Sequence, residues 1–213
     1  MVNITIYVEG GVLPSDDIAV QTADNSEKLR ESFHILLAQI ADETKFNLSV
    51  EVGSGEKQTI SFFKSQLKKN FKTLLLIDLD APERNKKEKL QMFDLTNEAD
   101  KVIFMVQKME AWILSQPEVI DRVLSERYKR EKVDLAIGQD NNIFEKNPES
   151  ITHPDRVLNT VFQRYFSELK RGVHKKKKYG KLKDAPLLIA NLDTKRLKET
   201  FSDFARICII LGK

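Results

Sequence analysis

The sequence predicts an α/β fold, with a mostly parallel sheet flanked by helices and a mainly helical C-terminal region. Apolar stretches of strand length alternate with stretches of helical period as far as Val106, and this alternation is typical of βαβ units. The run from Leu74 to Ile77 is continuously apolar, as expected of a strand buried on both faces of a parallel sheet. Beyond Pro117 the helical period predominates.

Four strands and the helices between them account for this first part of the chain. We expect strands over 3–8, 46–52, 71–79 and 102–106, because these stretches are rich in β-branched and apolar residues. A helix is expected over 27–42, with Ser26 as its N-cap, and a second over 56–70. The charged segment 83–94 is expected to be loop and helix.

The C-terminal part is predicted from the same patterns. Helical spacing is expected over 118–132, 156–170 and 195–211, with a basic linker between the second and the third. The polar stretch 141–154 contains prolines, asparagines and acidic residues, which favour a loop. We therefore expect a domain over residues 1–140 and a helical, basic region over 141–213 that is packed on it or appended to it.

Composition limits the class of protein. Of the 213 residues, 41% are hydrophobic and 31% are charged, as in ordinary globular proteins. The N-terminus has neither the basic start nor the long apolar stretch of a signal peptide, and no segment is apolar enough to span a membrane. The single cysteine, Cys208, excludes an internal disulfide and agrees with a reducing compartment. We expect a cytoplasmic protein without a membrane partner.

Positive charge is concentrated in one segment. The net charge is only +3, yet nine basic residues and one acidic residue lie between Arg164 and Lys183. Such a stretch can contact phosphates without reading base sequence, although charge runs are also often just solvated. The candidate nucleic-acid contacts in it are Lys175, Lys176, Lys177, Lys178 and Lys181.

Carboxylates end two of the predicted strands. Glu9 follows the first strand, while Asp78 and Asp80 follow the continuous apolar run. In an extended chain, side chains two residues apart point to the same side, and the carboxyl ends of parallel strands meet at one edge of the sheet. Carboxylate oxygens are the ligands that Mg²⁺ prefers. The three residues therefore predict a Mg²⁺ site, with Mn²⁺ as the alternative cation; the competing interpretation is that each merely begins a turn.

With these motifs the chain resembles the Toprim superfamily, the catalytic domain of topoisomerases, primases and OLD-type nucleases. That pattern is a glutamate after the first strand and an Asp-x-Asp after a later apolar strand. More narrowly, the chain is similar to a Toprim-like family of bacterial defence loci, encoded beside ABC-type ATPases. The similarity includes Tyr7-Val8-Glu9-Gly10-Gly11, Leu29-Arg30-Glu31-Ser32-Phe33, Gly53-Ser54, Asp78-Leu79-Asp80, Met105-Val106-Gln107-Lys108-Met109-Glu110-Ala111-Trp112 and Tyr179-Gly180-Lys181.

The resemblance implies a Mg²⁺-dependent nuclease that acts on DNA or tRNA as the effector of an antiphage system. Glu9 would then serve in acid/base chemistry or metal binding, and Asp78 and Asp80 would hold the cation. Glu110, after the fourth predicted strand, would join this catalytic group or cap the helix that follows. Arg30 would contact phosphate.

Several alternatives stay open. The sequence contains no Walker-type glycine-rich loop, so any use of ATP is assigned to the partner ATPase. The chain would otherwise be a non-catalytic module that binds nucleic acid or the ATPase, or an enzyme acting on a small nucleotide. One metal or two, and the number of chains in the assembly, a homodimer included, also stay open.

Overall fold

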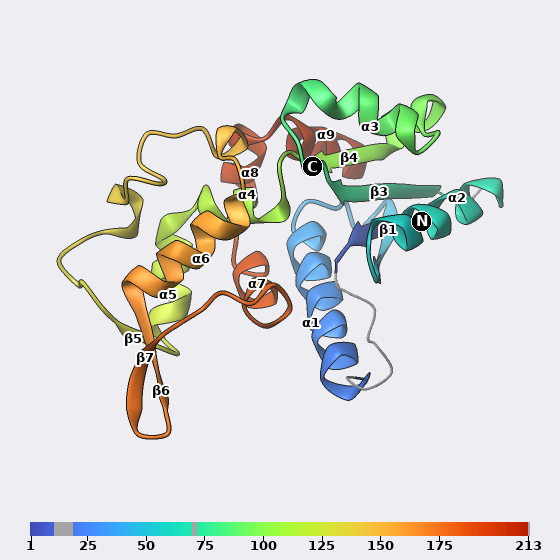
Figure 1. Ribbon diagram of the computed structural model, residues 1–213. Coiled ribbons are helices and arrows are strands. Elements are labelled where there is room, and N and C mark those ends of the chain that lie inside the picture. The colour runs from blue at the N-terminus through green and yellow to red at the C-terminus, as the bar shows by residue number, and fades with distance from the viewer. Residues whose placement is uncertain (11–18, 70–71, 213) are drawn as a thin grey trace.

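The computed structural model describes residues 1–10, 19–69 and 72–212, with residues 19–25 described by their backbone alone. The structure is α/β, with a four-stranded parallel sheet flanked by helices (Figure 1). This confirms the predicted fold class. Gly11, part of the turn expected after Glu9, lies outside the described residues, as do Asn70 and Phe71 at the expected junction of helix and strand.

The strands are β1 (Val2–Glu9), β2 (Phe46–Gly53), β3 (Lys72–Asp78), β4 (Val102–Met105), β5 (Lys129–Arg130), β6 (Phe166–Lys170) and β7 (Val173–Lys176). The helices are α1 (Ala19–Ala38), α2 (Glu56–Lys68), α3 (Lys86–Met92), α4 (Met109–Leu114), α5 (Pro117–Ser125), α6 (Pro154–Tyr165), α7 (Lys181–Ile189), α8 (Thr194–Thr200) and α9 (Ser202–Leu211). Short 3₁₀ turns occupy Glu83–Asn85, Thr96–Lys101, Ile137–Gln139 and Pro148–Ser150.

The parallel sheet has the order β2-β1-β3-β4. Glu9 is opposite Gly53, and Val8 is opposite Leu76. Because β2 lies on one side of β1 while β3 and β4 lie on the other, the chain changes direction across the sheet between β1 and β3. This is a topological switch point, where ligands of open α/β sheets usually bind, at the carboxyl ends of the strands.

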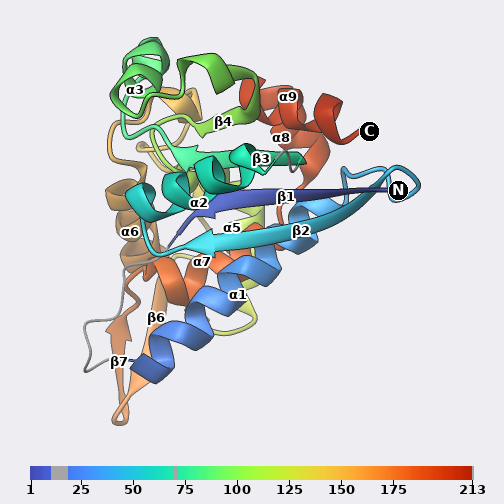
Figure 2. The same ribbon diagram turned by 90° about the vertical axis from the view of Figure 1, so that its right-hand side faces the viewer.

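Both faces of the sheet are covered. Figure 2 shows α1 on one face and α2 on the other. Leu74 and Leu76 belong to the larger hydrophobic core on the α1 side, while Leu75 and Ile77 belong to the smaller core on the α2 side. The continuous apolar run of β3 is therefore explained by burial on both faces, as predicted.

The C-terminal helices share the larger core with the sheet. Trp112 of α4 is fully buried and packs edge-to-face on Phe204 of α9, with 5.2 Å between ring centroids, and against Phe201 at 6.2 Å. Helix α7 packs against α1, and α9 packs against β4. Residues on both sides of position 140 thus contribute to one core cluster, and the division into domains at that position stays a prediction.

Some predicted boundaries are wrong. The first helix begins at Ala19, so Ser26 lies inside it and is not its N-cap. The helix expected over 118–132 ends at Ser125, because Arg130 of the following segment turns back to bind Asp121 and to cover the ring of Tyr165. In this second case tertiary contacts outweigh the local helical pattern.

The segment expected as the end of a helix and a basic linker is instead a β-hairpin. Helix α6 ends at Tyr165, and β6 pairs antiparallel with β7 across Arg171 and Gly172. Both turn residues have positive φ, 52° and 76°, as a two-residue hairpin turn requires. Strand β5 completes a three-stranded sheet, and the hairpin projects from the body of the molecule (Figures 1 and 2).

Within the described ranges, none of the helices combines the length and the apolar character needed to cross a bilayer.

Candidate functional site

The candidate site lies at the topological switch point of the sheet. Glu9 is the last residue of β1 and Asp78 the last residue of β3, its neighbour. The Asp78 backbone N–H donates a hydrogen bond of 3.2 Å to Glu9 Oε2. The two strand ends that the sequence singled out are thus brought together.

Asp78 is a buried carboxylate with partners on both oxygens. Its side chain accepts a hydrogen bond of 2.7 Å from the Met109 backbone N–H at Oδ1 and one of 3.0 Å from Lys181 Nζ at Oδ2. The first contact ties the end of β3 to the first turn of α4, where an acidic group is favourable. The second brings in a cation from α7, more than a hundred residues away in sequence.

Asp80 does not continue the strand. Its φ of 55° is in the left-handed region, which aspartate tolerates better than most residues, and its backbone N–H donates to Gln107 O at 2.7 Å. The expectation that Asp78 and Asp80 extend from one straight strand is therefore wrong. The Asp80 side chain is half-exposed and lies 3.5 Å from Lys89 Nζ and 3.9 Å from Lys108 Nζ.

Glu110 is a second buried carboxylate of the site, 1% exposed, in the first turn of α4. Its Oε1 accepts a hydrogen bond of 2.9 Å from the Tyr179 hydroxyl, while Oε2 has no hydrogen-bond partner among the described residues. Burial raises the pKa of Glu110, and the neighbouring Asp78 adds to the rise, whereas Lys181 and the Tyr179 hydrogen bond oppose it. Burial and Glu110 also raise the pKa of Tyr179 well above its usual value, so the phenol is the donor.

Lys181 supplies the positive charge that this carboxylate group needs. Burial alone would lower its pKa, but Asp78, Glu110 and Glu9 together raise it above the ordinary lysine value. A permanently charged ammonium therefore lies among three carboxylates.

Glu9 is the carboxylate with the most unusual ionisation. Its pKa is raised from 4.5 to about 7, first by burial and then by the charges of Asp78 and Glu56, against the opposing influence of Lys181 and Lys89. A carboxyl group that titrates near neutrality can both take up and release a proton at physiological pH.

One cavity of about 560 Å³ contains all four predicted catalytic carboxylates and two of the predicted phosphate-binding lysines. Its lining consists of Glu9, Asp78, Asp80, Lys108, Glu110, Asp155, Arg156, Asn159, Lys178, Tyr179 and Lys181. It therefore combines five carboxylates with four basic side chains. The basic side chains can attract a negatively charged ligand, and the carboxylates can hold a cation beside it.

The predicted metal ligands Glu9, Asp78 and Asp80 are not arranged around a common point in this conformation. Within residues 1–10, 19–69 and 72–212, no three His, Cys, Asp or Glu side chains form a group that could hold a metal ion. Asp78 has both oxygens engaged by Met109 and Lys181, and Asp80 turns toward Lys89 and Lys108. A cation would have to replace the contact between Asp78 and Lys181.

The structure separates the other predicted phosphate contacts. Arg30 lies on α1, where it forms an exposed ion pair with Glu27 at 3.5 Å, and it does not line the carboxylate cavity. Lys175 and Lys176 are exposed on the hairpin. Lys177 is buried, with 2% of its surface exposed, so it is not available to nucleic acid in this conformation.

Lys177 instead holds the segment that carries Tyr179 and Lys181. Its Nζ donates to Asp184 Oδ2 at 2.7 Å and to Lys178 O at 2.6 Å, and Asp184 Oδ2 also accepts from Gly180 N at 2.7 Å. The same ammonium lies over the rings of Tyr128 and Phe162, which is favourable for a desolvated cation. This clamp fixes the turn that directs two side chains toward the carboxylates.

The sequence interpretation missed several lining residues. Asp155, Arg156 and Asn159 lie on α6, for which the sequence predicted helical spacing but no site residue, and Asn159 Oδ1 accepts the Tyr179 backbone N–H at 3.1 Å. Lys108 bridges Asp80 and Asp155, at 3.9 and 3.4 Å. Lys108 lies directly before α4, and this position is a signal that could have assigned it to the site.

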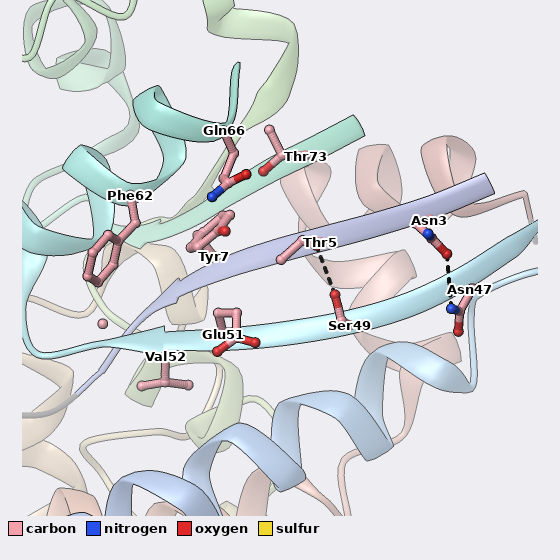
Figure 3. A pocket seen from close by; sticks show the side chains of 11 residues that line it. Asn3, Thr5, Tyr7, Asn47, Ser49, Glu51, Val52, Phe62, Gln66 and Thr73 are labelled. Atoms are coloured by element: carbon pink, nitrogen blue, oxygen red, sulfur yellow. Dashed lines mark hydrogen bonds between the residues drawn. The ribbon is translucent and has the colours of Figure 1, made fainter. Parts of the chain in front are cut away.

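A second polar cavity, of about 510 Å³, lies on the face of the sheet (Figure 3). Thr5 pairs with Ser49 and Asn47 with Asn3, so these side chains satisfy one another along β1 and β2. Glu51 is the one charged side chain among its described lining residues. The cavity therefore has neither the clustered carboxylates nor the cations of the candidate site.

Comparison with protein families gives one match, to a domain of unknown function (DUF4276), over residues 25–211. The chain belongs to this family. The matched range contains Asp78, Asp80, Glu110 and Lys181, and Glu9 precedes it. Comparisons with curated proteins and with solved structures found no significant match.

Replacing Glu9 with glutamine is predicted to stabilise the metal-free protein above neutral pH. Between pH 4.5 and about 7 the folded state keeps a proton on Glu9 that the unfolded state has lost, so the wild type loses stability as the pH rises through this window. The variant escapes this loss, gaining on the order of 2 kcal/mol near pH 8. Urea unfolding in EDTA measures the difference, and an equal effect at pH 4.5 and pH 8 would contradict the assignment.

Replacing Lys177 with methionine is predicted to destabilise the fold by about 3 to 5 kcal/mol, because it leaves Asp184 buried without its cation. Lys176→Met is the matched control. It removes the same charge from the adjacent exposed position and should change the unfolding free energy by less than about 0.5 kcal/mol. Equal effects of the two variants in urea unfolding would show that the buried pair is not structural.

Proposed function

We propose that the chain is a Mg²⁺-dependent nuclease that hydrolyses phosphodiester bonds of nucleic acid in the carboxylate cavity. The observation that carries the proposal is the convergence of Glu9, Asp78, Asp80 and Glu110 on a cavity that also contains Lys178 and Lys181. Carboxylates can hold a hard cation, and the lysines can attract a phosphate.

The donor chemistry fits Mg²⁺. Glu110 Oε2 is a buried oxygen without a hydrogen-bond partner among the described residues, and the pKa of Glu9 is raised by burial first and then by the negative charges of Asp78 and Glu56. We propose that Glu9, Asp78 and Asp80 hold the cation and that Glu110 supports it. When bound, Mg²⁺ would offset charge on the phosphodiester.

The protein's own groups would divide the remaining work. Glu9 would accept a proton from the attacking water or return one to the leaving oxygen, as one P–O bond forms and the other breaks. Lys181 would pair with a phosphate oxygen once released from Asp78. Tyr179 would keep Glu110 in place through its hydrogen bond.

The wider setting is proposed from the resemblance to Toprim-like defence proteins. In it the chain is a cytoplasmic effector of an antiphage system, acting on DNA or tRNA with a partner ABC-type ATPase. The basic hairpin, with Lys175 and Lys176, would add phosphate contacts outside the cavity.

The test is cleavage of DNA and tRNA by the purified chain, with and without the partner ATPase. Asp78→Asn is predicted to reduce cleavage at least about a hundredfold, as expected when an essential electrostatic group is removed, and EDTA should abolish it. Glu51→Gln, which removes an exposed carboxylate elsewhere on the sheet, is the matched control and should cleave like the wild type. Equal cleavage by all three proteins would refute the assignment.

A non-catalytic binding module is the competing function, and the same assay separates it. In that case nucleic acid would bind without being cut under any metal condition, in the presence of the partner as well. Cleavage of mononucleotides alone would instead indicate an enzyme of small nucleotides.

A further inference from the structure

A third cavity, the basic cavity, lies between α6 and the small sheet of β5, β6 and β7. It has a volume of about 380 Å³ and is lined by Lys132, Thr160, Gln163, Arg164 and Lys176. Three of these side chains are cations and a fourth is an amide donor. No carboxylate occurs among the described residues that line it, so the cavity favours an anion.

Its cations are held by separate elements. Arg164 Nη1 donates to Asp140 Oδ2 at 2.6 Å, and Asp140 is itself buried and accepts from Asn142. This contact fixes the guanidinium while leaving its other N–H groups for a ligand. Part of the Arg164 charge is thereby offset, so the excess positive charge comes from the two lysines.

The lysines are placed by the β5-β6-β7 sheet. Lys176 of β7 is opposite Ser167 of β6, which is opposite Lys129 of β5, and residues opposite one another share a face of the sheet. Lys132 follows β5, and Arg130 donates to its carbonyl oxygen at 3.4 Å. The cavity thus depends on the hairpin that the sequence interpretation read as a linker.

Helix α6 connects this cavity to the carboxylate cavity. Asp155, Arg156 and Asn159 line the carboxylate cavity, while Thr160, Gln163 and Arg164 line the basic one. Asn159 and Gln163 are four residues apart, and Arg156 and Arg164 eight, so the two cavities are separated by about 6 to 12 Å along the helix. A strand that runs along α6 can therefore place backbone phosphates in both cavities.

We propose that the basic cavity binds one backbone phosphate of a nucleic-acid strand while a nearby phosphate of the same strand occupies the carboxylate cavity. This inference rests on the proposed function, because it takes the carboxylate cavity as the place where the strand is cleaved. A phosphate suits the cavity because it presents only acceptors to its lysine, arginine and amide donors. The contact would set position along the strand and would not read sequence.

The experiment measures binding without cleavage, in EDTA, by fluorescence anisotropy of a short labelled single-stranded DNA and of the same sequence as RNA. Lys132→Ala/Lys176→Ala is expected to weaken binding about tenfold and to reduce the slope of log affinity against log salt by about 0.7, the value for the loss of one phosphate contact of a single strand. The control is Lys195→Ala/Lys198→Ala, which removes the same charge from exposed positions of α8. Affinity and slope equal to those of the control would overturn the proposal.

A small diester separates this inference from the proposed function. Hydrolysis of bis(p-nitrophenyl) phosphate with Mg²⁺ needs only the carboxylate cavity, so its rate should be unchanged in Lys132→Ala, whereas cleavage of the oligonucleotide should fall. Loss of both reactions to the same extent, in a variant that melts like the wild type, would count against a separate phosphate site. Weakened oligonucleotide binding in a protein that hydrolyses no diester would refute the nuclease and retain the basic cavity.

Discussion

The rest of the candidate site depends on the contact between Lys181 and Asp78, because this contact balances buried negative charge. Asp78 and Glu110 are almost fully buried, and isolated buried carboxylates are costly unless a cation or hydrogen bonds compensate them. Lys181 compensates Asp78 directly and Glu110 and Glu9 at longer range. Lys181 does not compensate Glu9 fully, because burial and the charges of Asp78 and Glu56 together raise the pKa of Glu9 to about 7.

The arrangement of the chain explains how these groups meet. The strand order β2-β1-β3-β4 brings the ends of β1 and β3 together at the switch point, which supplies Glu9 and Asp78. The turn after β4 leads directly into α4 and supplies Glu110. The last part of the chain closes the cavity from the other side, where the buried pair of Lys177 and Asp184 holds the turn that carries Tyr179 and Lys181.

The sequence was sufficient for those parts of the site that follow from strand periodicity. Glu9 and Asp78 could be placed because a strand end is marked by the change from apolar to polar residues, and parallel strands end at one edge. Asp80 could be assigned to the site but not oriented, because its left-handed backbone conformation depends on the hydrogen bond to Gln107. The sequence could not predict the partners of these residues, since Lys181 and Asp155 approach from helices whose packing no local pattern specifies.

The basic segment is a second case in which the sequence did not predict the surroundings of each side chain. Its lysines are adjacent in sequence, yet Lys177 is buried in an ion pair, Lys178 lines the carboxylate cavity and Lys176 lines the basic cavity. Lys176 is the last residue of β7 and the chain leaves the strand after it, so the three side chains reach different surroundings. Arg171 and Gly172 were the available signal for the hairpin, because a glycine between two basic stretches favours a tight turn. Helical spacing on either side obscured it.

Whether the carboxylates bind a divalent cation in place of Lys181 is the central question, and titration of the metal-free protein with Mn²⁺, followed by electron paramagnetic resonance, answers it most directly. The wild type is predicted to bind Mn²⁺, Asp78→Asn to bind it far more weakly, and Lys181→Met to bind it more tightly, because the competing ammonium is gone. If the wild type and Lys181→Met both leave Mn²⁺ free, or if Asp78→Asn binds it as well as the wild type, the carboxylate cavity is not a metal site.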